Sequence, residues 1–279
     1  MNGFFLVNKG DGDSSNFVVQ EIKKTFSFEK VGHLGTLDPA AEGLLIIAIN
    51  RATKFSNYFL NADKSYDVSV ELGVSTNTDD ATGEVIYESQ NIPKKQKIIE
   101  EIQKFKGISM QKPPFFSALK HKGKPLYKYA RKGNLIEKDP RKINIKNINN
   151  INVINNICSF NISCSKGTYI RSIARDLGEK LGCGAHMKSL KRISQDNFSI
   201  EDSRSLSELK IRHIIPIEDA FQNLETLELN SNELKFFLNG RKLINRTELT
   251  NIYKIIDQNN TFIGIGEIDN KCLKHKQLV

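Results

Sequence analysis

Hydrophobic and polar positions alternate in three different ways along this 279-residue chain, and each pattern predicts its own kind of element. The segment SYDVSVELGV carries apolar side chains at every second position from Tyr66 to Leu72, which predicts a half-buried strand. The run GLLIIAIN, from Gly43, is apolar throughout and predicts a buried strand. The segments NFVVQEIKKTF and GTYIRSIARDLGEKLGCG repeat apolar residues every three or four positions and predict helices.

The remaining elements follow from weaker patterns. FFLVNK predicts a first strand, RATKFSNYFLN a helix, and the stretch from Pro93 to about Phe105 another helix. Isoleucine-rich residues 143–164 predict two or three strands. A boundary is expected near Ala220, which divides the chain into a domain at 1–220 and a smaller unit of a helix and short strands at 221–279. Without a regular βαβ alternation, the mixture favours an α+β fold.

Composition adds a location and a class of partner. The chain has no apolar run long enough to cross a membrane, and its four cysteines form no CxxC pair. We read the N-terminus as a strand and expect a cytoplasmic protein with reduced thiols. The net charge of +9 lies in residues 112–146, where eleven Lys and Arg residues face two acidic ones. This concentration suggests nucleic acid as a partner, although a solvated lysine-rich surface is an equally good explanation of the charge alone.

One carboxylate stands out in the segment VGHLGTLDPAAEG. Asp38 follows Gly35 and precedes Pro39, so a rigid turn holds it within an apolar neighbourhood. Such a carboxylate can act as a nucleophile, but the segment alone favours an ordinary turn aspartate that bonds to its own backbone. In CSKGTYIRS, Tyr169 and Arg171 lie at a helix start, where the arginine can either pair with a buried carboxylate or face solvent. The scattered histidines predict no metal site.

Several segments together resemble one known family. GHLGTLDPAAEGLL, DKSYDVSVELG, TDDATGEV, KPPFFSALKHKGKPLYKYARKG and CSKGTYIRSIARDLGEKLGCGAH occur in the order and spacing found in TruB-type tRNA pseudouridine synthases. The resemblance covers nearly all of residues 3–220 and continues more weakly into a short PUA-like module. It implies a catalytic domain with a mixed, largely antiparallel sheet and flanking helices, and a small β-rich C-terminal RNA-binding module.

The resemblance also implies an activity. The expected enzyme flips uridine 55 out of the T-arm of tRNA and isomerises it to pseudouridine. The implied catalytic residues are Asp38 as the reactive carboxylate, Tyr66 as a stacking surface and candidate proton acceptor, and Arg171 as the ion-pair partner of Asp38. The implied substrate-binding residues are His33, Tyr169, Leu190, Lys54 and Lys9, the last two with RNA or structural roles. Because the reaction is redox-neutral, neither a cofactor nor a metal is expected, and we expect a monomer.

Two alternatives remain open alongside this interpretation. One is a non-catalytic RNA-binding protein or tRNA-folding chaperone on the same scaffold, and the other is a synthase that works within a guide-RNA particle. The sequence departs from the family pattern at Lys9, where glycine stands in place of the usual following proline, so a looser turn is expected there. The basic segment interleaves Phe115, Phe116, Tyr127 and Tyr129 with lysines, as stacking and phosphate contacts require, although core packing explains these aromatic residues too.

Overall fold

The computed structural model describes residues 1–244, 246 and 249–279. Its main sheet is formed by β1 (Gly3–Lys9), β2 (Val31–His33), β3 (Ala41–Ile49), β4 (Lys64–Leu72), β7 (Gly107–Gln111), β10 (Arg141–Ile154), β11 (Ile157–Cys164), β12 (Ala185–Gln195), β13 (Phe198–Ser199) and β14 (Ile215–Pro216). The strand order is β14-β1-β3-β12-β4-β11-β10-β7, with β2 beside β3 and β13 beside β12. Among these strands only β3 and β12 pair in parallel. The predicted α+β class with a mixed, largely antiparallel sheet is confirmed.

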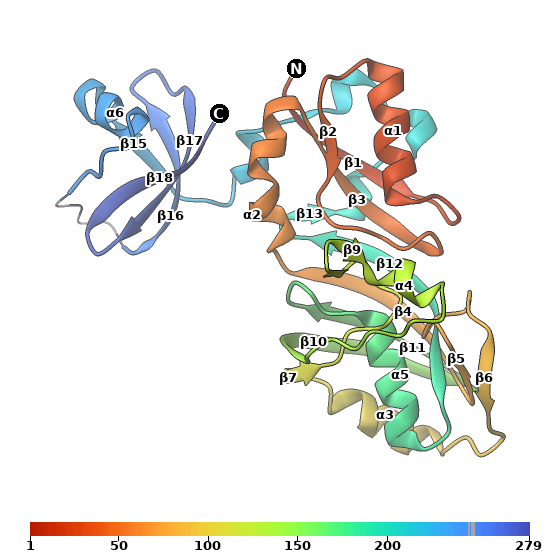
Figure 1. Cartoon of the computed structure of the whole chain (residues 1–279). Coiled ribbons are helices and arrows are strands. Elements are labelled where there is room, and N and C mark those ends of the chain that lie inside the picture. Colours follow the sequence, from red (N-terminus) through yellow and green to blue (C-terminus); the bar gives the residue numbers. More distant parts are fainter. Residues whose placement is uncertain (245, 247–248) are drawn as a thin grey trace.

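The half of the sheet that contains β1 and β3 is covered on both faces (Figure 1). Helix α1 (Ser15–Phe26) packs on one face, and the 3-10 turn η1 (Asn50–Phe55) followed by α2 (Ser56–Leu60) packs on the other. Alternate side chains of β3 therefore enter two separate cores, which explains why its sequence is apolar throughout. The single helix expected for RATKFSNYFLN is thus divided into a 3-10 turn and a short α-helix.

The other half of the sheet is covered on one face. Helices α3 (Lys95–Gln103) and α5 (Ile170–Leu181) share a core with β4, β10, β11 and β12. Along β4 the side chains of Tyr66, Val68, Val70 and Leu72 are buried and those between them are not, as the alternation predicts. Neither α1 nor α5, the longest helices among the described residues, nor any shorter one is long and apolar enough to span a membrane.

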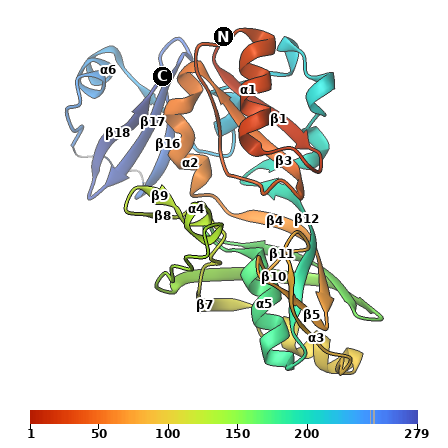
Figure 2. The same cartoon turned by 45° about the vertical axis from the view of Figure 1, so that its right-hand side comes forward.

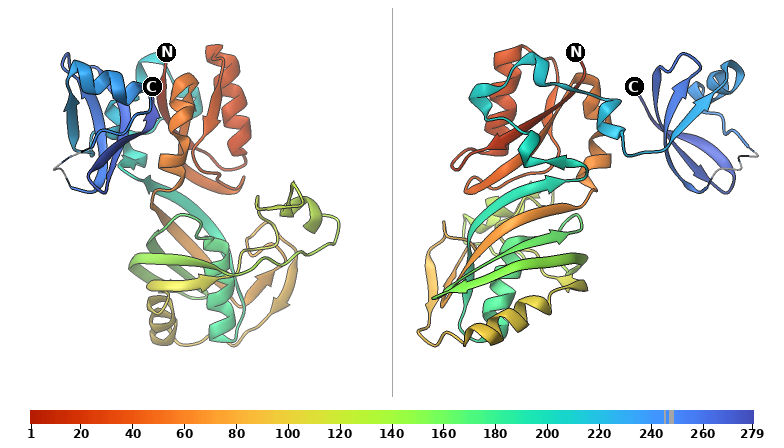
Figure 3. Two further views of the ribbon diagram at one scale, coloured as in Figure 1. Left: turned by 60° about the vertical axis from the view of Figure 1, so that its left-hand side comes forward. Right: turned by 180° about the vertical axis from the view of Figure 1, so that it is seen from behind.

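The basic segment, defined here as residues 112–140, connects β7 to β10. It contains β8 (Lys120–His121), β9 (Lys124–Pro125) and the short helix α4 (Leu126–Ala130). In Figure 3 (left) it projects from the sheet as an arm of irregular chain. A second excursion carries β5 (Val74–Thr76) and β6 (Val85–Glu88), which pair with each other.

A separate β-rich module ends the chain. It comprises β15 (Thr226–Leu229), α6 (Ser231–Leu238), β16 (Asn251–Asp257), β17 (Phe262–Asp269) and β18 (Cys272–Leu278). The strands form one sheet in the order β15-β16-β17-β18, which lies beside α2 in Figure 2. Phe262 and Ile265 of β17 pack against Phe55 and Phe221. The link to the module runs through η2 (Ile200–Asp202), η3 (Leu206–Glu208), η4 (Ile211–His213) and η5 (Asp219–Phe221). The division at residue 220 stays a prediction.

Candidate active site

The loop between β2 and β3 carries Asp38, and buried side chains from the start of the chain hold its backbone. The hydroxyl of Ser15 accepts a hydrogen bond from Leu37 N at 2.8 Å and donates one to Leu37 O at 2.9 Å. The ammonium of Lys9, which is 1 % exposed, donates to Pro39 O at 3.0 Å. The residues that flank Asp38 are therefore fixed by α1 and β1 before any substrate arrives.

Strand β12 holds the same loop from its other side. Arg192 Nη2 donates to Gly35 O at 3.0 Å, and Gln195 Nε2 donates to Leu34 O at 2.6 Å. Gly35 has φ of 140°, and a Cβ at this position would lie 3.3 Å from Arg192 Nη1. Glycine is required here because the backbone both adopts a conformation that L side chains avoid and approaches the arginine closely.

Arg171, in the first turn of α5, forms an ion pair with Asp38 in the loop before β3. Its Nη2 lies 3.0 Å from Asp38 Oδ2, and its side chain is 7 % exposed whereas that of Asp38 is 40 % exposed. The predicted pairing is therefore present in the structure. The carboxylate remains accessible to solvent while the guanidinium is buried, which leaves Asp38 able to meet a substrate.

Further acceptors hold the Arg171 guanidinium. Nη2 donates to Phe116 O at 2.9 Å, Nη1 donates to Thr78 O at 3.2 Å, and Nη1 lies 3.4 Å from Asp80 Oδ2. Asp80 is itself oriented by Thr82, whose N and Oγ1 donate to Asp80 Oδ1 at 3.0 Å and 2.6 Å. This support fixes the guanidinium plane from behind, so Arg171 presents one edge to Asp38.

Sequence reasoning missed the role of Asp80. The segment TDDATGEV contributed to the family resemblance, yet nothing in its residues indicated a contact with Arg171, 91 positions further along the chain. The available signal was a pair of adjacent carboxylates before Ala-Thr-Gly, which also fits a solvent-exposed turn. Only the structure shows that Asp80 is 8 % exposed and faces the guanidinium.

The pKa of the Asp38 carboxyl is raised above its ordinary value. Removal of water by the surrounding protein is the main cause, the Arg171 guanidinium opposes it, and the negative charge of Asp80 adds to it. The positive charge of Arg171 therefore favours the ionised form of Asp38. Without its charge, desolvation and Asp80 would both favour the neutral acid, which is a poor nucleophile.

Tyr66 and Leu190 form the apolar side of the site. Leu190 on β12 pairs in register with Ala41, three residues after Asp38, and with Val68 of β4. Tyr66 lies two residues before Val68 on β4, where it pairs with Arg192 of β12, and it is 7 % exposed. Burial raises the pKa of the Tyr66 phenol to about 12, although the hydrogen-bonded Arg192 guanidinium opposes that shift. The phenol is therefore protonated at neutral pH, which makes Tyr66 a flat surface and a weak base in the free protein.

His33 and Tyr169 flank this group. His33 ends β2, and its buried Nδ1 has no hydrogen-bond partner among the described residues. Burial and the nearby Arg192 lower the pKa of His33, so its ring is neutral. Tyr169 precedes α5, and the guanidinium carbon of Arg141 lies 4.4 Å from its ring centroid.

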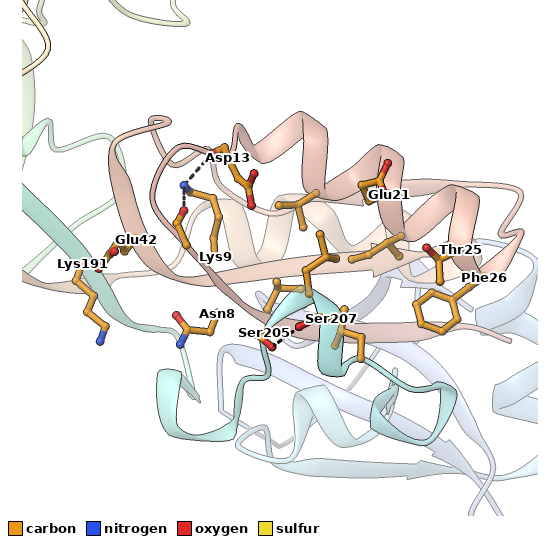
Figure 4. A pocket seen from close by; sticks show the side chains of 16 residues that line it. Asn8, Lys9, Asp13, Glu21, Thr25, Phe26, Glu42, Lys191, Ser205 and Ser207 are labelled. Carbon is orange, nitrogen blue, oxygen red and sulfur yellow. Dashed lines mark hydrogen bonds between the residues drawn. The ribbon is translucent and has the colours of Figure 1, made fainter.

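The two lysines assigned weakly from sequence have different positions. Lys9 lies behind the Asp38 loop and also donates to the carbonyls of Gly10 and Asp13, so the turn that lacks the usual proline is tied down by this side chain. Figure 4 shows Lys9 beside Asp13 at the edge of a cavity of about 750 Å³ between α1 and η3. Neither Asp38 nor Tyr66 lines that cavity. Lys54 is exposed in η1 and lines a groove between α2 and the C-terminal module.

The basic segment is anchored next to the site at its start. Gln111, which is 2 % exposed, exchanges two hydrogen bonds with the backbone of Tyr169, at 2.8 Å and 3.0 Å. Lys112 O accepts from Ser172 Oγ at 3.0 Å, and Phe116 O accepts from Arg171 as described above. A strand of nucleic acid bound by this segment would therefore lie close to Asp38. Among the described residues, no group of three or more His, Cys, Asp and Glu residues could hold a metal ion.

Three family models match the chain in series. The first, "TruB family pseudouridylate synthase (N terminal domain)", matches residues 23–170, which is more than half of the chain. The second, "tRNA pseudouridylate synthase B C-terminal domain", matches residues 171–225, and the third, "Pseudouridine synthase II TruB, C-terminal", matches residues 226–279. The matched regions together include every candidate site residue except Lys9.

Curated relatives and solved structures agree with these matches. A protein of Clostridium kluyveri named tRNA pseudouridine synthase B is 42 % identical over 95 % of each chain. Its namesake in Haemophilus influenzae is 36 % identical over 100 % of this chain and 95 % of its own. Among solved structures, one titled "Crystal Structure of a Cbf5-Nop10-Gar1 Complex" superposes with a TM-score of 0.74 at 23 % identity, covering 99 % of this chain and 84 % of that one. At that identity the likeness supports the fold alone.

Proposed function

Since this chain belongs to the TruB family of pseudouridylate synthases, we propose that it isomerises uridine 55 in the T-arm of tRNA to pseudouridine. The observation that carries the proposal is the contact of 3.0 Å between the half-exposed Asp38 and the buried Arg171. The relatives act, by their names, on tRNA. The Arg171 charge favours the ionised form of the Asp38 carboxyl, which is the form that would assist breaking of the bond between ribose and N1. The reaction moves no external group, because C5 replaces N1 at the same ribose.

The remaining residues have roles that their positions support. Tyr66 would stack on the uracil, and Leu190 would close the apolar side of the pocket. The partly exposed ring of the neutral His33 would lie against the displaced RNA and help to keep the uridine outside its stack. Because the phenol of Tyr66 has a pKa of about 12, we assign it the stacking role ahead of proton transfer.

Contacts with the rest of the T-arm must offset the few kcal/mol that extrusion of a base costs. The basic segment is placed for this, since its exposed lysines at 120, 122 and 124 extend from an anchor beside Arg171. Lys54 belongs to a different surface, and Lys9 is too buried to touch RNA, so we propose a structural role for Lys9. We further propose that the protein acts as a cytoplasmic monomer.

One assay tests the activity. The purified protein is incubated alone with an unmodified tRNA transcript, and pseudouridine is mapped along the RNA. Pseudouridine at position 55 supports the proposal. Absence of product with bound tRNA would favour a chaperone, and product that appears only with an added guide RNA would favour a particle-bound synthase.

The matched variant is Asp38→Asn, which keeps the size of the side chain but removes its charge. We expect a rate of pseudouridine formation at saturating tRNA that is lower by about 10³-fold or more, with unchanged tRNA affinity. Glu42→Gln, a nearby exposed carboxylate, is the control and should keep its rate. Wild-type turnover by Asp38→Asn would remove the aspartate from the chemistry.

A further inference from the structure

A buried guanidinium without a carboxylate partner lies behind the candidate site. Arg192 is 1 % exposed, and no carboxylate of the described residues lies within ion-pair distance of it. Burial of a charge is strongly unfavourable unless the charge is paired and hydrogen-bonded. A cation in this position therefore needs an explanation beyond packing.

Its hydrogen-bond partners are all parts of the candidate site. Nε donates to Leu44 O at 2.7 Å on β3, and Nη2 donates to Gly35 O at 3.0 Å in the Asp38 loop. The third partner is the phenol of Tyr66, which stands directly opposite Arg192 on β4. One rigid, planar group thus connects the loop that carries Asp38 to the strand that carries Tyr66.

The backbone around Arg192 allows this connection. Gly43 pairs with Arg192 in the parallel ladder, and a Cβ at Gly43 would lie 2.3 Å from Arg192 O. The ladder between β12 and β4 has a register irregularity between Arg192 and Ser194. The backbones of β3 and β12 therefore approach each other closely beside the guanidinium.

We propose that Arg192 is a positioning residue for the isomerisation. It holds the Tyr66 hydroxyl and the Asp38 loop in a fixed position relative to each other, and it places a positive charge next to the phenol. Two consequences follow. The stacking face of Tyr66 and the carboxylate of Asp38 keep a constant separation, and any negative charge that develops on the phenol oxygen during proton transfer is stabilised. The second consequence agrees with the opposing effect of Arg192 on the raised pKa of Tyr66.

The first test needs no RNA and so stands apart from the proposed function. 3-Fluorotyrosine is placed at position 66 of the full chain, and its fluorine resonance is followed through a pH titration. Arg192→Met removes the charge but keeps an unbranched side chain, and we expect the titration midpoint to rise. Arg192→Lys keeps the charge and should give a midpoint between those of the wild type and Arg192→Met. The control is Lys191→Met, the exposed neighbour that lines the cavity of Figure 4, and it should leave the midpoint unchanged.

The second test measures rate and rests on the proposed function. Arg192→Met should slow single-turnover pseudouridine formation about tenfold to a hundredfold without weakening tRNA binding, since the side chain is buried. In a Tyr66→Phe background the same substitution should cost less, because one of its three acceptors has already been removed.

Three results would overturn the proposal. These are an unchanged fluorine midpoint in folded Arg192→Met, a rate loss of equal size with and without the Tyr66 hydroxyl, and a wild-type rate in Arg192→Lys. Circular dichroism shows whether Arg192→Met folds. If it does not, the rate of pseudouridine formation by Arg192→Lys tests the proposal instead. A slower reaction with unchanged tRNA affinity supports the proposal, because lysine cannot reproduce the planar set of donors.

Discussion

The Asp38 loop and the basic segment both contact Arg171, and they differ in how firmly the rest of the protein holds their backbones. The loop is bound along its length by side chains of Lys9, Ser15, Arg192 and Gln195, which come from three different elements. The basic segment is tied firmly at its anchors and exposes most of its lysines. On the proposed function, this difference would separate two tasks: the reactive carboxylate is on backbone held by many hydrogen bonds, and RNA binding is on an exposed arm.

Phe116 is the point where the two regions meet. Its carbonyl belongs to the basic segment, yet it accepts a hydrogen bond from the arginine that pairs with Asp38. The comparison predicts that changes in the loop and its supports alter the rate of reaction at saturating tRNA, whereas changes in the arm alter tRNA affinity. The predictions below test this separation, ordered by their expected effect on that rate.

Arg171→Ala should have the largest effect. It leaves Asp38 beside Asp80 without the charge that opposes the rise in its pKa, and it breaks an ion pair whose guanidinium is buried and whose carboxylate is partly exposed. Because solvent screens the exposed carboxylate, the lower end of the 3–5 kcal/mol typical of buried pairs applies, and we expect a rate lower by about 10²-fold. Quench-flow kinetics at saturating tRNA would measure it, with exposed Arg51→Ala as the control. A rate near wild type would exclude Arg171 from the site.

Asp80→Asn should have an intermediate effect with a characteristic pH dependence. The ionised form of Asp38 is the active one, so the rate rises as pH increases through its pKa. Since the charge of Asp80 raises that pKa, the substitution should move the rising limb to lower pH while the plateau falls about tenfold through poorer support of Arg171. A pH–rate profile would measure both effects, with exposed Glu88→Gln as the control. A limb that moves to higher pH would contradict this account.

Lys9→Met should act mainly on stability. Three carbonyls lose a charged donor, which we expect to lower the free energy of unfolding by about 1–3 kcal/mol and the rate by a few-fold through a looser Asp38 loop. Urea denaturation and tRNA binding are measured together, with Lys24→Met, an exposed lysine of α1, as the control. Weaker tRNA binding by Lys9→Met with unchanged stability would assign Lys9 to the RNA surface instead.

The triple substitution of Lys120, Lys122 and Lys124 by Gln should leave the rate at saturating tRNA unchanged. Each lysine that contacts a phosphate contributes a slope of about 0.7 to 0.9 in the logarithm of affinity against the logarithm of salt. We therefore expect weaker binding and a slope smaller by about two. Replacing Lys94, Lys95 and Lys97 at α3 gives the same change of charge as a control. An unaltered salt slope would place the RNA on another surface.

The sequence by itself determined most of the elements and the family, and through the family it predicted the turn that carries Asp38. Periodicity predicted α1, β3, β4 and α5 because burial of one face, or of both, directly shapes the residue pattern. It was less successful for RATKFSNYFLN, where a 3-10 turn starts the helix, since both forms bury similar faces. The series of motifs indicated the family and, through it, the pair Asp38 and Arg171.

Only the tertiary structure decided which polar side chains support that pair. Asp80, Lys9 and Arg192 resemble surface residues in the sequence, because nothing in a local pattern shows that a charged group will find acceptors in distant strands. The partner of Arg192 on β4 lies 126 positions earlier in the chain, and its contact depends on the register of β12 against two neighbouring strands. Whether a buried polar group finds a hydrogen-bond partner depends on the assembled backbone. This is the physical reason why the pairing of Asp38 with Arg171 could be predicted from motifs and the side chains that support it could not.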